Sequence, residues 1–128
     1  MEQKEIVLRV PAKEGYGAVL RMTLGGVAIL WDFSIEVMED MRMAADEAFY
    51  CLLHQSVEPE AVSLTVSEVE GGLSIALAGE YSKAPLVGDE EALLLTRSVL
   101  ETLVPVVNLF SEGKGGIARI EMLFPREG

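Results

Sequence analysis

A glutamate and a cysteine stand four residues apart, at Glu47 and Cys51, in a segment whose apolar residues recur at helical spacing. Side chains four residues apart lie on the same face of a helix, so we expect this carboxylate and this thiol to be neighbours. A carboxylate in such a place can serve as a general base, and a thiol can serve as a redox sensor. The alternatives are a partly exposed helix carboxylate for Glu47 and a small buried apolar side chain for Cys51.

A histidine, His54, follows Cys51 by three residues and could share a metal ion with it. Two ligands do not make a structural zinc site, so we expect a surface histidine and no metal site. The Gly-rich segment SEGKGG, residues 111–116, lacks the G-x-x-x-x-G-K-S/T spacing of a phosphate-binding loop. We therefore expect it to be a hairpin turn rather than a phosphate site.

The elements that must position these side chains follow from apolar periodicity and from the Pro and Gly residues between periodic segments. The Gly71-Gly72 pair predicts a hairpin turn, Ser34 predicts a helix N-cap, and Pro105 ends the last helix. In chain order we expect a strand over 6–10, helices over 15–31 and 35–55, strands over 62–66 and 73–77, a helix over 89–104, and strands over 106–110 and 117–124. This order predicts one domain over residues 1–128, an α+β two-layer sandwich with a mostly antiparallel sheet and three helices on one face.

The apolar residues that recur along the first two helices predict which helix faces are buried. The Gly25-Gly26 pair weakens the first helix by roughly 1 kcal/mol per glycine and leaves room for close approach of another backbone. Among the methionines of these helices, we expect Met43 to be the exposed one. The expected stripe is Val19, Met22, Val27, Leu30 and Trp31 in the first helix, and Ile35, Met38, Met41, Ala45, Ala48, Leu52 and, one step off, Phe49 in the second.

The composition is that of an acidic globular domain, with 128 residues, half of them apolar, and a net charge of −11. A strongly negative chain is a poor binder of nucleic acid and of anionic membranes, whereas a basic protein partner would suit it. The single cysteine excludes an internal disulfide and favours a cytoplasmic protein. The first ten residues predict a strand rather than a signal peptide, and no apolar run is long enough for a membrane span.

Two stretches, IVLRVPAKEGYGAVLRMTLGGVA and FSIEVMEDMRMAADEA, follow each other within the first 55 residues. They resemble, in order, the first strand and the first two helices of the partner-switching anti-sigma-factor serine kinases. Further along, LTRSVLETLVPVV is similar to the last helix of that family. The family shares a superfamily with gyrase and the histidine kinases, so the resemblance implies a histidine-kinase-like ATPase fold, also called the Bergerat fold.

The resemblance implies a nucleotide site with three parts, and this chain departs from the family in each. In the second helix, the family's Glu falls on Glu47, whereas the Asn that binds magnesium falls on Cys51. A thiol is a poor ligand for a hard cation that prefers oxygen. The adenine-binding Asp of a D-x-G-x-G turn falls on Gly79, and the nearest carboxylate, Glu80, stands out of register.

The third part of the family's site is a long lid with a Gly-rich turn that wraps the phosphates. Here only SKAPLVGDEEA, residues 82–92, separates the strand from the last helix, and Leu93, Leu94 and Leu95 stand near the place of the glycines. Leucine does not permit the close backbone approach that glycine offers. From these concordant departures we expect a degraded nucleotide site, with Glu47 as a vestigial base and with neither ATP nor Mg²⁺ as a cofactor.

These expectations lead to one main hypothesis, an anti-sigma-factor-like regulatory binding protein, a pseudo-kinase of a bacterial partner-switching pathway. The resemblance implies a homodimer and a protein partner, which would be a sigma factor, a STAS-type anti-anti-sigma protein or a kinase-like paralogue. Arg21 matches a partner-contact position in the family's first helix, where a guanidinium can clamp a carboxylate. A solvated helix arginine is the alternative interpretation of Arg21.

Two other functions stay open on the sequence. One is an active ATP-dependent serine/threonine protein kinase that phosphorylates a STAS partner. In that case ATP and Mg²⁺ would be bound, and Glu47 would activate the acceptor serine. The other is a structural subunit that pairs with an intact paralogue.

Overall fold

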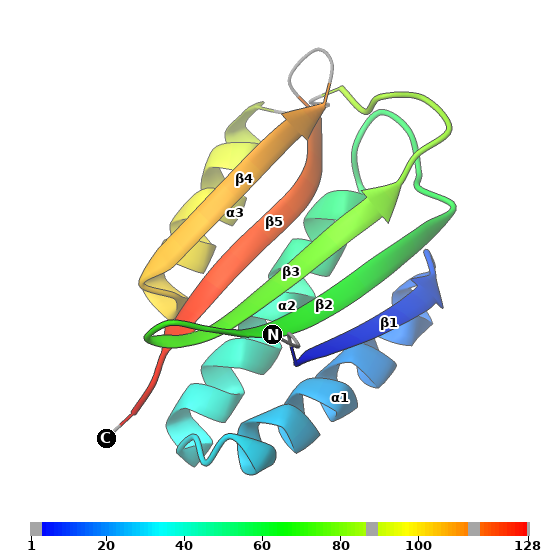
Figure 1. Cartoon of the computed structure of the whole chain (residues 1–128). Helices are drawn as coiled ribbons and strands as arrows, with labels where there is room; N and C mark the ends of the chain where they lie inside the picture. The colour runs from blue at the N-terminus through cyan, green and yellow to red at the C-terminus, as the bar shows by residue number, and fades with distance from the viewer. Residues whose placement is uncertain (1–3, 87–89, 113–115, 128) are drawn as a thin grey trace.

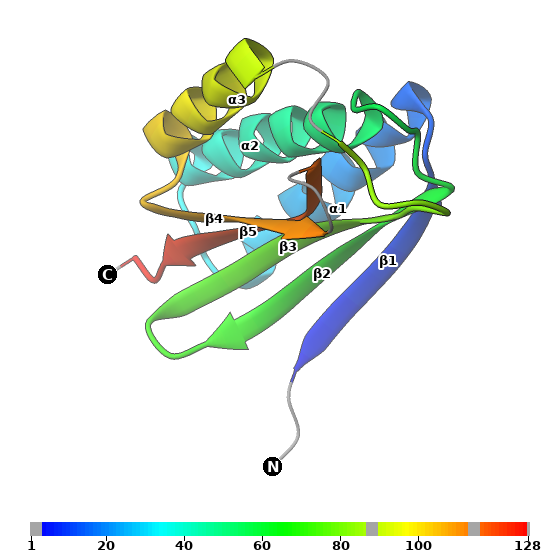
Figure 2. The ribbon, with the colours of Figure 1, turned by 90° about the horizontal axis from the view of Figure 1, so that it is seen from above.

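The computed structural model describes residues 4–86, 90–112 and 116–127, and it arranges them in two layers, a sheet and a set of helices that all cover one of its faces (Figures 1 and 2). A short 3₁₀ turn over Glu14–Tyr16 precedes the first helix. The elements in chain order are β1 (Glu5–Pro11), α1 (Gly17–Leu30), α2 (Ile35–Leu53), β2 (Ala61–Val69), β3 (Gly72–Glu80), α3 (Glu90–Leu103), β4 (Val106–Glu112) and β5 (Gly116–Pro125). The predicted α+β two-layer fold is confirmed, with each boundary shifted by at most a few residues.

The sheet has the strand order β1-β2-β3-β5-β4, and each neighbouring pair is antiparallel. The β2–β3 connection is the predicted hairpin, and Gly71 adopts φ +85°, a conformation that favours glycine. The predicted SEGKGG turn falls partly on residues 113–115, which lie outside the described part of the chain. The strands on either side of it pair antiparallel, with Glu112 opposite Gly116.

The core lies between the sheet and the helices. Alternate residues of the strands point to the helix layer, as the period-2 pattern of the sequence predicts. No helix in the described part of the chain is long and apolar enough to cross a membrane. The largest side chains that are almost fully buried come from both layers: Leu64, Leu73, Ile75, Leu77, Ile120 and Met122 from the sheet, and Leu20, Leu24, Met41, Leu52 and Leu100 from the helices.

Helix α2 begins and packs largely as the sequence predicts. Ser34 caps it, because the Ser34 Oγ accepts a hydrogen bond of 3.2 Å from the Val37 N–H, an interaction that typically stabilises a helix by about 1 kcal/mol. The expected stripe is wrong at Ile35, which is exposed at the first turn of the helix. It is confirmed at the positions nearer the middle and the end of the helix, where Met41, Ala45, Ala48, Phe49 and Leu52 are all buried.

Helix α1 faces the core with a different side from the one we expected. Met22 and Leu30 are 76% and 71% exposed, whereas Leu20, Leu24 and Ala28 are buried. The expected burial of Val19, Met22 and Leu30 is therefore wrong, whereas that of Val27 is confirmed. The helix is apolar on nearly all sides, with Arg21 as its one charged residue, so apolar spacing alone does not fix which side is buried.

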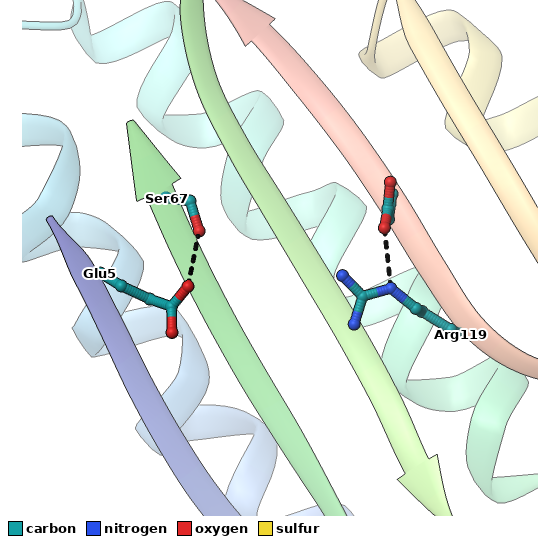
Figure 3. A network of polar contacts seen from close by, with 4 residues as sticks. Glu5, Ser67 and Arg119 are labelled. Carbon is teal, nitrogen blue, oxygen red and sulfur yellow. Dashed lines mark hydrogen bonds and ion pairs between the residues drawn. The ribbon is translucent and has the colours of Figure 1, made fainter. Parts of the chain in front are cut away.

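The opposite face of the sheet, away from the helices, carries short polar contacts (Figure 3). Ser67 Oγ donates to a Glu5 carboxylate oxygen at 3.3 Å, from β2 to β1, and Arg119 Nε donates to a Glu121 carboxylate oxygen at 2.8 Å within β5. An antiparallel sheet with one face on the core and one face in solvent has this alternation.

Candidate functional site

Helix α2 places Glu47 and Cys51 on one face, where the negative charge of Glu47 disfavours the thiolate form of Cys51. Burial, with a smaller contribution from Glu47, raises the pKa of Cys51 from 9.0 to about 11. The thiol is therefore neutral at neutral pH, and a neutral thiol is neither a good nucleophile nor a ligand for a hard cation. This geometry favours the interpretation of Cys51 as a small buried apolar side chain.

Glu47 is held by the last helix. One of its carboxylate oxygens, Oε1, accepts a hydrogen bond of 2.9 Å from Thr96 Oγ1 in α3. Thr96 is buried and Glu47 is half-buried, so this bond joins α3 to α2 inside a partly dry environment. The interpretation of Glu47 as a partly exposed helix carboxylate did not include this partner.

Gly79 lies on the helix-facing side of β3, where an aromatic ring covers it. The ring of Tyr81 occupies the space into which a Cβ at position 79 would point. Any side chain there, including the Asp that the family resemblance calls for, requires the Tyr81 ring to move. The ring is itself anchored, because the Tyr81 hydroxyl donates a hydrogen bond of 2.6 Å to the Leu52 carbonyl oxygen at the end of α2. Burial raises the pKa of this phenol to about 12.

Gln55 completes this arrangement, which we call the Tyr81–Gln55 clasp. The Gln55 Nε2 donates to the Tyr81 hydroxyl at 3.0 Å and to the Ile117 carbonyl oxygen at 2.6 Å. The Ile117 N–H donates in turn to Gln55 Oε1 at 2.6 Å. The clasp therefore ties together the end of α2, the end of β3 and the start of β5.

The segment that leaves β3 is fastened to the loop after α2. The Leu86 N–H donates to Ser56 Oγ at 2.7 Å, and the Ser56 N–H donates to the Leu86 carbonyl oxygen at 3.3 Å. Pro85 packs so closely on Gly116 that a Cβ at Gly116 would collide with the Pro85 carbonyl oxygen. The first part of the 82–92 connection is thus fixed against the sheet, while its residues 87–89 lie outside the described part of the chain.

Glu80, which the resemblance assigned to the nucleotide site, lies elsewhere, and the leucines near the place of the family's glycines are part of a helix. Glu80 is on the face of the sheet away from the helices, because it follows the inward-facing Gly79 and neighbours along a strand point to opposite faces. There Glu80 accepts a 2.6 Å hydrogen bond from Arg9 Nε. Leu94 and Leu95 are part of α3 and are exposed. The structure therefore does not bring Glu80 together with Glu47 and Cys51.

Arg21 is neither free nor fully solvated. Its Nη1 lies 2.8 Å from Asp46 Oδ1, so an ion pair connects α1 with α2. Asp46 and Tyr50 line a cavity of about 230 Å³ between these helices, together with Arg21. Asp46 and Tyr50 also line a groove of about 390 Å³ on the other side of α2.

His54 is a surface histidine, as predicted. Its Nε2 lies 2.9 Å from a carboxylate oxygen of Glu14, and its ring lies against the ring of Tyr50. Within residues 4–86, 90–112 and 116–127, no three His, Cys, Asp or Glu side chains converge as a set of metal ligands.

Sequence reasoning missed the residues that fill this region, namely Tyr81, Gln55 and Thr96. One general signal pointed to Tyr81, since the hydroxyl of a buried tyrosine usually finds a hydrogen-bond partner. Neither Gln55 nor Thr96 carries a local signal, because each bonds to an element distant in the chain.

Comparison with curated proteins shows that the chain is similar in sequence to serine-protein kinases. The serine-protein kinase RsbW of Bacillus mycoides (strain KBAB4) is 32% identical over 63 residues, which cover 49% of this chain and 39% of that relative. The serine-protein kinase RsbW of Bacillus thuringiensis (strain Al Hakam) is 29% identical over 77 residues, which cover 59% of this chain and 48% of that relative. The chain thus matches less than half the length of these relatives. No family model matches it.

Proposed function

Since the chain belongs to the family of anti-sigma-factor serine kinases, we propose that it is a cytoplasmic regulatory binding protein of a partner-switching pathway that no longer transfers phosphate. The observation that carries this proposal is the Tyr81 ring on Gly79, with its hydroxyl bonded to the Leu52 carbonyl oxygen. An adenine at this place would have to displace the ring and break the clasp.

Cys51 supports the same proposal. A magnesium ion that bridges phosphates needs oxygen ligands, and a buried neutral thiol at the position of the family's Asn supplies none. Glu47, the remaining carboxylate of the family's helix, uses one oxygen to hold Thr96. The residues present at these positions thus do not fit Mg²⁺–ATP in the way the family's residues do.

Titration with Mg²⁺–ATP and with Mg²⁺–ADP tests the loss of the nucleotide site. We expect no heat of binding and no rise in melting temperature, because a ligand stabilises the native state only if it binds it. A micromolar nucleotide at a hundredfold excess over Kd would stabilise the protein by about 2.7 kcal/mol, an effect that thermal unfolding detects easily. Such a rise would contradict the proposal.

We propose that the protein partner docks on α1. The outward side of this helix exposes large apolar side chains beside Gly26, where a Cβ would meet no atom of the described chain within 4 Å. Arg21 stands at the edge of this side, and its ion pair with Asp46 fixes the direction of the guanidinium. The exposed apolar side chains of the α1 surface are Val19, Met22, Ile29 and Leu30.

A pair of lysine variants tests this surface against candidate partners: a sigma factor, a STAS-type protein and a kinase-like paralogue. Met22→Lys places a charge in the α1 surface, whereas the control variant Leu94→Lys places the same charge on an exposed part of α3. We expect Met22→Lys to weaken the complex at least about tenfold and Leu94→Lys to leave it within about twofold, as measured by titration calorimetry. Equal effects of the two variants would count against docking on α1.

The α1 surface also suits self-association. Two copies of a chain with net charge −11 repel each other, and this repulsion is weakest at a surface without acidic side chains, such as α1, whose one charge is Arg21. We propose a homodimer, or a pair with a paralogous subunit, through this helix. Light scattering should then give twice the 13.9 kDa of one chain and should return a single chain for Met22→Lys.

An active serine kinase is the second candidate function, and the retained carboxylate of Glu47 on α2 is the observation that favours it. Incubation with radiolabelled ATP and a STAS-type partner, with Glu47→Gln as the control, separates the two functions. Label transfer that disappears in Glu47→Gln would establish the kinase and would overturn the proposal of a binding protein without phosphoryl transfer.

A further inference from the structure

A groove of about 390 Å³ runs between α2 and α3, on the side of these helices away from the sheet. Figure 2 shows the two helices lying beside each other above the strands. The groove belongs neither to the α1 surface nor to the Tyr81–Gln55 clasp. Its lining side chains are Met43, Asp46, Glu47 and Tyr50 from α2, and Val99 and Leu103 from α3.

The floor of the groove is apolar and open to solvent. Met43 and Tyr50 are 53% and 57% exposed, although both are large side chains that a core would accommodate. On α3, Leu95 stands one helical turn before Val99 and so extends the apolar wall, and it is 65% exposed. Exposed apolar side chains gathered in a concave surface indicate a binding site rather than scattered surface residues.

The two walls of the groove differ in charge. The α3 wall, formed by Leu95, Val99 and Leu103, is uncharged, whereas two of the four lining side chains from α2, Asp46 and Glu47, are acidic. Each uses one oxygen in the bonds to Arg21 and to Thr96, and within the described residues the other oxygen is left for an incoming cation.

We propose that this groove binds a basic amphipathic helix of a partner protein. The apolar side of that helix would lie on Met43, Tyr50 and the α3 wall, and its Lys or Arg side chains would reach the carboxylates of α2. A helix laid in an apolar groove is a common mode of peptide recognition, and here the charge of one wall selects a basic helix over an acidic one. Helix α3 has 14 residues and is about 21 Å long, so about 14 to 18 residues of the partner would fill the groove.

The test uses a labelled peptide of about 18 residues in which Leu and Lys alternate with helical periodicity, which puts Leu on one side and Lys on the other. We expect fluorescence anisotropy to show micromolar binding that weakens as salt rises from about 0.1 M to about 1 M, since salt screens charge pairs. A peptide with Glu in place of Lys, and one with the same composition in scrambled order, should bind at least about tenfold more weakly.

Two neighbouring leucines provide the matched variants. Leu94 and Leu95 are equally exposed, at 65%, but Leu95 continues the line of Val99 and Leu103 whereas Leu94 lies on another side of α3. We expect Leu95→Lys to weaken peptide binding at least about tenfold and Leu94→Lys to change it by less than about twofold. Circular dichroism on both variants verifies that each is folded.

Three results would each overturn the proposal. The first is the absence of binding by the Lys peptide, and the second is equal weakening by Leu94→Lys and Leu95→Lys, which would indicate unspecific attraction to a negative chain. The third is a loss of binding in Met22→Lys as large as that in Leu95→Lys, which would place the peptide on α1. Because nucleotide is not involved in this test, its outcome is independent of whether the chain transfers phosphate.

Discussion

The two regions that border helix α2, the Tyr81–Gln55 clasp at its end and the groove along its middle, differ in how their side chains are used. In the clasp, the polar groups of Tyr81 and Gln55 find partners in one another and in the backbone of Leu52 and Ile117. In the groove, large apolar side chains and carboxylate oxygens face solvent. Side chains that satisfy each other in this way stabilise the fold, and side chains left open are available to a partner.

Resemblance to the kinase family suggests the opposite arrangement, with the end of α2 open. In the family, the end of the second helix borders the nucleotide, so that region would be open in a working kinase. Here it is closed by the chain's own residues, while the open surfaces lie on α1 and between α2 and α3. Under the proposed loss of the nucleotide site, the contacts of the clasp satisfy polar groups that would be costly if they were buried without partners.

The largest expected effect comes from two tyrosines that represent the two regions. Tyr81→Ala removes the ring that covers Gly79 and the bond to Leu52, and we expect it to lower the free energy of unfolding by about 3 kcal/mol. Tyr50→Ala, in the groove, should cost less than about 1 kcal/mol because its ring is more than half exposed. Urea unfolding of both variants measures this, and equal losses would remove the distinction between clasp and groove.

The next effect concerns the amide of the clasp. Gln55→Ala leaves the Ile117 N–H and carbonyl oxygen and the Tyr81 hydroxyl without their partner, so we expect a loss of about 2 kcal/mol. Asn108→Ala, an exposed amide on β4, is the control and should change the free energy of unfolding by less than about 0.5 kcal/mol. A loss in Gln55→Ala as small as in the control would mean that the clasp contributes little.

A third prediction concerns alkaline pH. The pKa values of Cys51 and Tyr81 are raised to about 11 and about 12, so the unfolded chain releases these protons before the native protein does. The unfolded state then binds fewer protons, and the free energy of unfolding falls as pH rises above about 9, by about 1 kcal/mol for Cys51 at pH 10. Unfolding measured from pH 8 to pH 11 should show this decline, and Cys51→Ala should decline less steeply. Parallel curves would contradict the raised pKa of the thiol.

The smallest effect is expected in the groove. Leu94→Lys and Leu95→Lys replace exposed side chains on α3 and should change the free energy of unfolding by less than about 0.5 kcal/mol each. Thermal unfolding of both variants measures this. A loss above about 2 kcal/mol in Leu95→Lys would show that this leucine is part of the core and not of an open wall.

Much of the fold could be predicted because local chemistry carries it. Ser34 has the side chain that an N-cap requires, Gly71 suits the turn between β2 and β3, and strand residues such as Leu64 and Leu77 alternate with small or polar ones. The buried side of α1 could not be predicted, because an almost wholly apolar helix has no polar side to mark the solvent.

The candidate site was predictable only in part for a related reason. Glu47 and Cys51 are four residues apart, so helical geometry alone places them together. Gln55 bonds to Ile117 across 62 residues and Thr96 bonds to Glu47 across 49, and such pairs depend on how the elements pack. Even the position of Glu80 required the strand register, which sends it to the face opposite Gly79.

Asp46 borders two surfaces of the molecule at once. It lines the groove beside α3 and the cavity beside α1, where it holds the guanidinium of Arg21. A cation that binds the second oxygen of Asp46 from the groove side shares this carboxylate with Arg21, so it weakens the ion pair that fixes the direction of the guanidinium beside the α1 surface. Thermodynamic reciprocity requires that each ligand change the affinity of the other by the same factor, so one carboxylate makes the two surfaces of this small domain energetically linked.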